Sequence, residues 1–297
     1  MSAQCVAVIA DSTCYLPAGW ASEFSIGIVP VQVIVGGQAF DETEDTQAQR
    51  VAEALGNWQP VTTSRPSPMR FLEAYASAQE AGATAVVVAT LSASMSATYE
   101  SALLAGKECD IPVHVVDTRS IAMGLGFAAV SGARAARAGA DAARVAELIE
   151  RRAAASSVFF YVDTLEYLRR GGRVGAARAA MGQALQVKPL LKVDDGRVER
   201  LEQVRTAGRA LARLEDLAVT AAEQAGGSSS DSTAEVDIAV QHLGAPDRAA
   251  ALAERLRGRL PLATVVEGVV GGVVGAHVGP GMVAVVVAPR VDESRDG

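Results

Sequence analysis

The first half of the chain alternates short apolar runs with longer segments of helical pattern. The apolar runs predict strands at 5–10, 26–35 (interrupted by Pro30), 85–89 and 113–116. The helical patterns lie at 46–55, 68–81 (preceded by Ser67 as N-cap, with Pro68 first), 96–107, 121–138 and 141–154. Because strands and helices alternate, we predict a doubly wound α/β domain whose mainly parallel sheet is covered on both faces.

The pattern changes from about residue 158, where hairpin and helix signals are mixed. Asp194-Asp195-Gly196 separates two strand-like segments and predicts a β-hairpin. Strands are predicted at 158–162, 186–193, 197–203, 236–241, 264–269 and 282–288. Helices are predicted at 165–170, 174–185, 206–224 and 246–257. We therefore predict two domains, an N-terminal α/β domain over 1–157 and a C-terminal α+β domain over 158–297.

Composition and charge exclude several classes of protein. The chain has 297 residues, 49% of them hydrophobic, which is enough for two folded domains with ample core. A formal charge of −7 argues against a general nucleic-acid binder. Three cysteines without disulfide or metal spacing favour a reducing compartment. The N-terminal apolar run is typical of a strand rather than a signal peptide, and no apolar stretch is long enough to span a bilayer, so we expect a cytoplasmic protein without stable membrane insertion.

Hydroxyl side chains are concentrated directly after the predicted strand at 85–89. The segment SASMSATYES at 92–101 carries five Ser or Thr hydroxyls and the phenol of Tyr99. A turn of this kind ahead of a helix can hold an anion, because helix N-termini expose unpaired N–H groups and hydroxyls add neutral donors. Capping of the helix is the alternative explanation.

Polar residues follow other predicted strands as well. Asp11 and Asp117 come directly after the strands at 5–10 and 113–116, and Thr63-Ser64 follows another short apolar segment. Because ligands bind outside the carboxyl ends of the strands in this architecture, we expect all of them to meet the hydroxyl segment at one edge of the sheet. No cluster of metal ligands gathers around either aspartate in the sequence, which favours capping over metal binding.

Eight short motifs occur in order along nearly the whole chain, the last of them placing His277 in a predicted glycine turn at 275–281. They are Asp11-Ser12-Thr13 with Leu16-Pro17, 63–67 (TSRPS), 94–99 (SMSATY), Asp117-Thr118 with Gly124, 168–174 (LRRGGRV), 188–190 (KPL), 204–206 (VRT) and 277–281 (HVGPG). In this order they resemble the DegV family of bacterial fatty-acid-binding proteins, the acyl-carrying partners of fatty acid kinase. The chain departs from the family pattern at Ala97, Arg65 and Ala276, where Gly, Gln and Thr are usual.

The resemblance implies a lipid-binding protein rather than an enzyme. It implies that a long-chain fatty acid lies in a buried tunnel between the two domains and presents its carboxylate to the ATP-binding subunit of a fatty acid kinase. That subunit would supply ATP and Mg²⁺ and form an acyl phosphate for phospholipid synthesis, so no cofactor, metal ion or catalytic residue is expected in this chain. The residues expected to bind the carboxylate are Thr63, Ser64, Ser94, Ser96, Thr98, Arg205 and His277. Arg170 and Arg173 beside a glycine pair are expected to contact the kinase, with a solvated turn as the alternative.

Two other functions stay open at this point. An autonomous hydrolase could use Ser96 with His277, although the sequence has no G-x-S-x-G motif and no acidic residue obviously placed behind the histidine. A soluble sensor of lipids or other small molecules is the second alternative. For single residues, His277 could instead satisfy a backbone carbonyl, and Arg205 could be a surface residue beside the hairpin.

Overall fold

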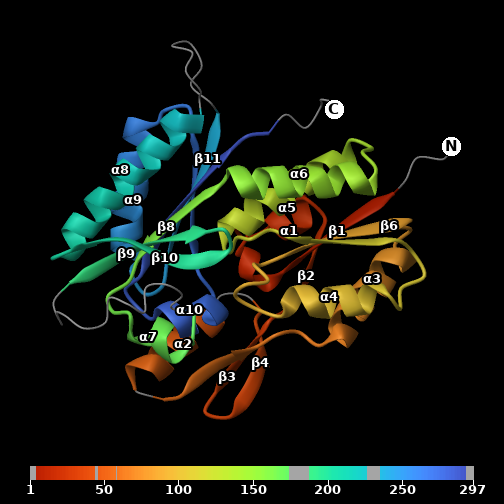
Figure 1. Ribbon diagram of the computed structural model, residues 1–297, viewed down its shortest axis with the longest axis horizontal. Coiled ribbons are helices and arrows are strands. Elements are labelled where there is room, and N and C mark those ends of the chain that lie inside the picture. The colour runs from red at the N-terminus through yellow and green to blue at the C-terminus, as the bar shows by residue number, and fades with distance from the viewer. Residues whose placement is uncertain (1–4, 44–45, 58, 174–186, 226–234, 292–297) are drawn as a thin grey trace. The chain divides into compact units, whose positions relative to one another are not determined.

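A computed structural model describes residues 5–43, 46–57, 59–173, 187–225 and 235–291 (Figure 1). The chain divides into two compact units. The first draws its residues from Met1–Gln32, Ser64–Ala155 and Val291–Gly297, and the second from Val33–Thr63 and Ser156–Arg290. The helix predicted at 174–185 lies outside the described residues. Among the helices that are described, none is both long and apolar enough to cross a membrane.

The first unit is a doubly wound α/β domain, as predicted. Its four strands lie in the order β2-β1-β6-β7, and every neighbouring pair is parallel. Its elements are β1 (Val6–Asp11), the 3-10 turn η1 (Ser12–Cys14), α1 (Trp20–Glu23), β2 (Ile26–Val29), α3 (Pro68–Glu80), β6 (Ala85–Thr90), α4 (Thr98–Gly106), β7 (Val113–Asp117), α5 (Met123–Arg137) and α6 (Ala142–Ala155). The predicted strands and long helices of this unit are confirmed, whereas α1 was not predicted. Pro68 is the first residue of α3 as expected, but the Ser67 side chain makes no capping hydrogen bond.

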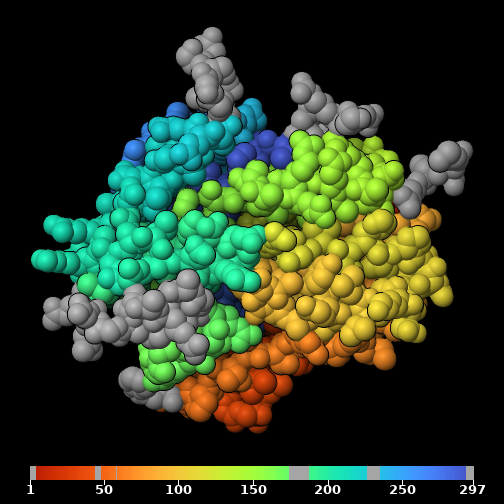
Figure 2. All heavy atoms as spheres, viewed as in Figure 1, coloured from red at the N-terminus to blue at the C-terminus, as the bar shows by residue number. Residues whose placement is uncertain are grey.

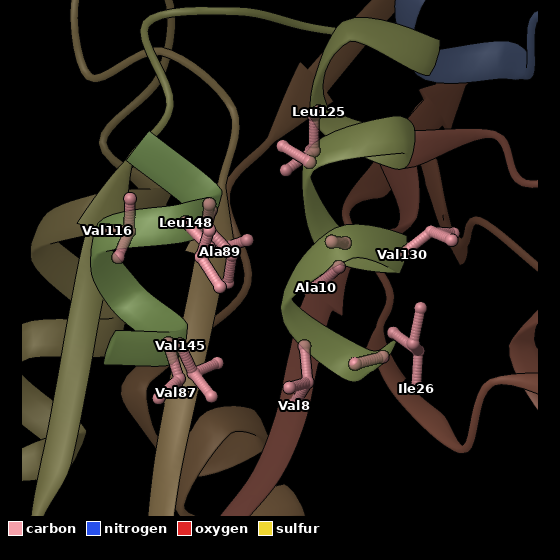
Figure 3. Packing of buried hydrophobic residues seen from close by; sticks show 14 of the residues in the cluster. Val8, Ala10, Ile26, Val87, Ala89, Val116, Leu125, Val130, Val145 and Leu148 are labelled. Atoms are coloured by element: carbon pink, nitrogen blue, oxygen red, sulfur yellow. The ribbon is translucent and has the colours of Figure 1, made fainter. Parts of the chain in front are cut away.

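Side chains alternate between the two faces of this sheet, and both faces are covered. One face packs against α5 and α6 (Figure 3), through Val8, Ala10, Val87, Ala89, Leu125, Val130, Val145 and Leu148. The other packs against α3 and α4, through Ile9, Val86, Val88, Phe71 and Tyr75. Every residue of β6 is buried, which is why its sequence is a continuous apolar run. The outer side of α4 lies at the surface (Figure 2, yellow) and exposes Leu103 and Leu104.

The second unit is an α+β domain, as predicted. Its main sheet has the order β10-β9-β8-β13-β11-β12 and is antiparallel except for the pair β11–β12. A smaller sheet, β4-β3-β5, comes from the segment 32–64. The elements are β3 (Gln32–Val35), β4 (Gln38–Asp41), α2 (Thr46–Gly56), β5 (Val61–Ser64), β8 (Ser157–Tyr161), α7 (Glu166–Arg170), β9 (Lys188–Asp194), β10 (Arg197–Val204), α8 (Ala207–Ala225), β11 (Val236–His242), α9 (Pro246–Arg259), β12 (Thr264–Val269), α10 (Gly272–Val278) and β13 (Val283–Pro289). Helices α8 and α9 bury the apolar face of the main sheet.

The turn between β9 and β10 confirms the predicted hairpin. Asp195 and Gly196 both have positive φ, at 45° and 76°, and Asp194 pairs with Arg197. This is the backbone conformation that a two-residue hairpin turn requires and that Asp-Gly adopts readily.

Two predictions of local structure are wrong. Thr63 lies within β5 rather than after a strand, since β-branched threonines suit a paired strand. His277 lies in the last turn of α10 rather than in a glycine turn. A Cβ atom on Gly275 would stand only 3.0 Å from Leu243 and 3.5 Å from Val51, so the glycine allows close packing that holds this short helix in place.

Candidate functional site

The hydroxyl segment of the first unit forms a tight turn between β6 and α4. The N–H groups of Met95 and Ser96 donate to the carbonyl oxygen of Ser92 at 2.9 and 3.1 Å. Ser92 is fully buried, and its hydroxyl accepts from the N–H of Ser94 at 3.2 Å. Ala97 precedes α4 with φ −79° and ψ 25°, which alanine adopts without strain, so the departure from the family's glycine leaves this turn intact.

Two aspartates at strand ends hold this turn. Asp11 Oδ2 accepts from the N–H of Leu91 at 2.6 Å, and Asp117 Oδ1 accepts from the N–H of Ala93 at 3.1 Å. The meeting of both aspartates with the hydroxyl segment at one sheet edge is thus confirmed, whereas Thr63 belongs to the second unit. Asp11 caps η1, and Asp117 accepts a further hydrogen bond from the N–H of Arg119 at 2.9 Å. The described part of the chain contains no group of three or more His, Cys, Asp or Glu side chains that could hold a metal ion.

Asp11 has an unusual ionisation equilibrium. It is fully buried, and this burial raises the pKa of its carboxyl from 3.8 to about 6. Three hydrogen bonds oppose the shift: the Thr13 hydroxyl and N–H donate to Oδ1 at 2.5 and 3.0 Å, and Leu91 donates to Oδ2. Burial outweighs the donors, although at neutral pH the carboxyl is still mainly ionised.

Ser96, one of the residues predicted to bind a carboxylate, lies in this turn next to Thr98. Its Oγ lies 2.8 Å from Oγ1 of Thr98, which is fully buried, whereas Ser94 is exposed. When Thr98 donates to Ser96, the Ser96 proton remains available for a ligand. Either hydroxyl can be the donor in this hydrogen bond.

Within the second unit, Thr63 of β5 and His277 of α10 lie side by side. Oγ1 of Thr63 and Nε2 of His277 are 2.9 Å apart, although the residues are 214 positions apart in sequence. Nδ1 of His277 is buried and has no hydrogen-bond partner among the described residues. The pair therefore combines one hydroxyl and one imidazole, both of which can serve as neutral hydrogen-bond donors.

The pair lines a cavity of about 400 Å³ within the second unit. The lining residues are Leu55, Gln59, Pro60, Val61, Thr62, Thr63, Tyr167, Arg170, Gly171, Arg173, Ala276 and His277. Two of them are arginines, and no Asp or Glu occurs among the described lining residues. The lining thus includes hydroxyl, imidazole and guanidinium groups, which are the kinds of donor that bind an anion.

The electrostatics of His277 keep its ring neutral. Burial, together with the positive charge of Arg173, lowers its pKa from 6.5 to about 4. At neutral pH the ring therefore carries one proton and can donate only one hydrogen bond.

Of the two arginines predicted to contact a partner, Arg170 is the last residue of α7 and Arg173 lies in the turn that follows. Arg170 Nε and Arg169 Nη2 both donate to Glu166 at 2.7 Å, and these two bonds lower the pKa of the Glu166 carboxyl to about 2. Arg173 Nη1 donates to the carbonyl oxygen of Gly171 at 2.7 Å. Both Arg170 and Arg173 are exposed, so the turn presents guanidinium groups to solvent and to the cavity at once.

The remaining predicted residues lie elsewhere. Arg205 is exposed just after β10 and is not among the described residues that line the cavity. Ser64 donates to the carbonyl oxygen of Arg65 at 3.3 Å, and the Arg65 side chain is exposed. Gly171 lines the cavity but was not predicted as a site residue. The glycine pair between two arginines is the feature of the sequence that could have indicated it.

Comparisons with known proteins identify relatives over nearly the whole chain. A family model described as "Uncharacterised protein, DegV family" matches residues 5–290. A DegV domain-containing protein of Streptomyces coelicolor is 50% identical over 286 residues, which cover 96% of this chain and 99% of the relative. A DegV domain-containing protein of Mycobacterium tuberculosis is 35% identical over 291 residues, which cover 95% of this chain and 96% of the relative.

Solved structures share the fold. A DegV family protein from Thermus thermophilus, described by its fatty acid binding, matches with a TM-score of 0.87 and 29% identity, over 96% of this chain and 99% of that chain. DegV of Bacillus subtilis, described as a fatty acid binding protein, matches with a TM-score of 0.86 and 26% identity, over 97% of this chain and 100% of that chain.

Proposed function

The chain belongs to the DegV family, and we propose that it binds a long-chain fatty acid in the cytoplasm and presents the carboxylate to the ATP-binding subunit of a fatty acid kinase. The product would be an acyl phosphate that feeds phospholipid synthesis. The single observation that carries the proposal is the cavity of the second unit, in which Thr63 and His277 share a wall with Arg170 and Arg173. The fatty acid binding described for the Thermus and Bacillus relatives supports it.

The tail and the carboxylate of a fatty acid are bound by different kinds of interaction. At about 0.8 kcal/mol per buried CH₂, a tail of roughly sixteen carbons supplies on the order of 10 kcal/mol before the costs of binding. The carboxylate loses its water, and an unpaired charge in apolar surroundings costs several kcal/mol unless donors replace that water. We assign this role to Thr63 together with His277 beside it, both of which line the cavity. Ser64, Ser94, Ser96, Thr98 and Arg205 stay predictions from the sequence.

Neutral donors also suit the chemistry that follows. In the reaction, a carboxylate oxygen forms a bond to the γ-phosphorus of ATP, and the bond from that phosphorus to the bridging oxygen breaks to release ADP. A carboxylate in a full ion pair would be a weaker nucleophile than one held by hydroxyl and neutral imidazole donors. ATP and Mg²⁺ would come from the kinase, and we assign Arg170 and Arg173 to contacts with the incoming phosphoryl group or with an acidic surface of the partner.

The first test is direct. Organic extraction of the purified protein, followed by mass spectrometry, should recover a long-chain fatty acid at close to one per chain. Protein that yields no acyl carboxylate and does not bind added palmitate would refute the proposal. The same preparation, assayed alone with a chromogenic ester, should show no turnover. That result separates a carrier from a hydrolase. In a catalytic triad a carboxylate accepts from the second ring nitrogen of the histidine, whereas Nδ1 of His277 has no such partner among the described residues.

The role of the partner needs a second test. Arg170→Glu with Arg173→Glu should abolish acyl-phosphate formation with a fatty acid kinase subunit. Palmitate binding should persist, because in this proposal Thr63 and His277, and not the two arginines, hold the carboxylate. Arg151→Glu is a matched control, because Arg151 pairs with Glu147 four positions before it, as Arg170 pairs with Glu166, but lies on α6. Phosphorylation that survives the double reversal would exclude the docking role. Joint loss of binding and phosphorylation would show that the two arginines hold the carboxylate instead.

A further inference from the structure

The ring of His277 is bonded at one nitrogen only. Nε2 lies 2.9 Å from Oγ1 of Thr63, whereas Nδ1 is buried without a hydrogen-bond partner in the described residues. A hydroxyl can either donate to a ring nitrogen or accept from it, so the distance alone does not decide which ring nitrogen carries the proton.

Gly171 lies against the unpaired nitrogen. A Cβ atom built on Gly171 would overlap Nδ1 of His277 and would stand 2.8 Å from Cε1. The backbone of Gly171 has φ −73° and ψ −10°, a conformation open to every residue, so the chain path does not require glycine there. The space taken by the imidazole ring does require it.

This packing makes the two tautomers unequal. A proton on Nδ1 would be a buried donor that faces the CH₂ group of Gly171, and buried donors without an acceptor are rare because they lose a hydrogen bond to water. An unprotonated Nδ1, which leaves only a lone pair without a partner there, costs less free energy than a buried N–H without an acceptor. The neutral ring has one proton to place, and Nε2 has an acceptor for it in Thr63.

The ligand adds a second reason. If Nε2 accepted the proton of Thr63, that hydroxyl would offer only lone pairs to the cavity, and a carboxylate there would be repelled. If Nε2–H donates to Thr63, the hydroxyl proton is left to point at the anion. Thr63 can donate to an anion in the cavity only in the second arrangement.

We infer that His277 is held as the Nε2–H tautomer by the close approach of Gly171, and that it donates to Thr63 so that Thr63 donates to the carboxylate. His277 is then a positioning residue that acts through Thr63, and Gly171 selects its tautomer. The step from Thr63 to the carboxylate rests on the proposed function. The tautomer itself does not.

The tautomer can be measured without any ligand. In ¹⁵N NMR spectra of the full chain at pH 7, Nδ1 of His277 should have the shift of an unprotonated ring nitrogen and Nε2 that of a protonated one. Comparison with His277→Gln assigns these signals against the other two histidines of the chain. A protonated Nδ1 would overturn the inference.

Substitutions test the relay to the ligand, with palmitate as the probe. Gln places its amide N–H near the position of Nε2, whereas Asn places it near Nδ1, so His277→Gln should bind palmitate about tenfold or more tightly than His277→Asn. Thr63→Val should weaken palmitate binding as much as His277→Asn does. The double variant Thr63→Val with His277→Asn should bind palmitate no more weakly than either single variant, because His277 acts on the carboxylate only through Thr63. Equal affinities for the Gln and Asn variants, or additive losses in the double variant, would overturn the relay.

Gly171→Ala should displace the ring, weaken palmitate binding about tenfold and change the ring-nitrogen shifts. Gly258→Ala is the matched control, since a Cβ atom on Gly258 has no neighbour within 4 Å. If Gly171→Ala fails to fold, the His277 variants still decide the question. If the wild-type protein binds no palmitate at all, the proposed function fails while the NMR result still accepts or rejects the tautomer.

Discussion

Asp11→Asn isolates the effect of one buried charge on stability. The Asp11 side chain is fully buried and accepts three hydrogen bonds, one from Leu91 and two from Thr13. Asparagine has nearly the same shape and keeps one carbonyl oxygen as acceptor, but it cannot ionise. The variant therefore has one hydrogen-bond acceptor fewer at this position, and the side chain no longer titrates.

The size of the effect follows from the pKa. Burial raises the pKa of Asp11 from 3.8 in the unfolded chain to about 6 in the folded protein. Between these values the folded state binds the proton more tightly, so the free energy of unfolding falls as the pH rises through the window. A shift of roughly two pH units corresponds to about 3 kcal/mol. This stability is present below pH 3.8 and lost above about pH 6.

His277 has the opposite sign and must be separated from Asp11. Its pKa falls from 6.5 to about 4 on folding, so stability is lost as the pH drops through that range. The histidine is the same in wild type and in Asp11→Asn. Its contribution therefore cancels when the two proteins are compared at each pH.

Urea unfolding of both proteins at several pH values between 3.5 and 7 provides the assay. We expect the difference in unfolding free energy to move by about 3 kcal/mol in favour of the asparagine variant as the pH rises. In parallel, the carboxyl carbon of Asp11 should titrate near pH 6 in NMR spectra of the wild type. A difference that stays constant across this range, with a carboxyl that titrates near its ordinary value, would refute the reasoning from burial.

Three further predictions concern the ligand, the core and a turn. Ser96→Ala should weaken palmitate binding by about 1–3 kcal/mol in equilibrium titrations and leave the melting temperature of the ligand-free protein unchanged; equal affinities would remove Ser96 from the site. Leu148→Ala should lower the free energy of unfolding in the same urea assay by about 2–5 kcal/mol, because the side chain is fully buried. The control Leu104→Ala, at a side chain that is 51% exposed, should change it by less than about 0.5 kcal/mol, and similar losses in the two variants would contradict the core assignment. Gly281→Ala should destabilise by at least about 1 kcal/mol in thermal unfolding, because φ is +89° and a Cβ atom would overlap Asp163; an unchanged melting temperature would mean that the turn relaxes freely.

The sequence by itself determined those features whose cause lies within a few neighbouring residues. The continuous apolar run of β6 predicts a strand covered on both faces, and all six of its residues are buried. The Asp195-Gly196 turn depends on local backbone conformation. The hydrogen bonds that Asp11 and Asp117 accept from the N–H groups of Thr13 and Arg119, two positions further on, are local as well, so these features too could be predicted.

Tertiary structure alone decided the features that depend on partners distant in sequence. No local signal shows that the segment 33–63 belongs to the second unit. Its strands β3, β4 and β5 pair with one another, and the unit to which this small sheet belongs is decided by contacts with residues distant in sequence. The helix around His277 contains glycines that oppose helix formation, and it exists because it packs closely against Leu243 and Val51. The contact between Thr63 and His277 spans 214 positions, and the need for glycine at 171 arises only once that imidazole ring lies beside it.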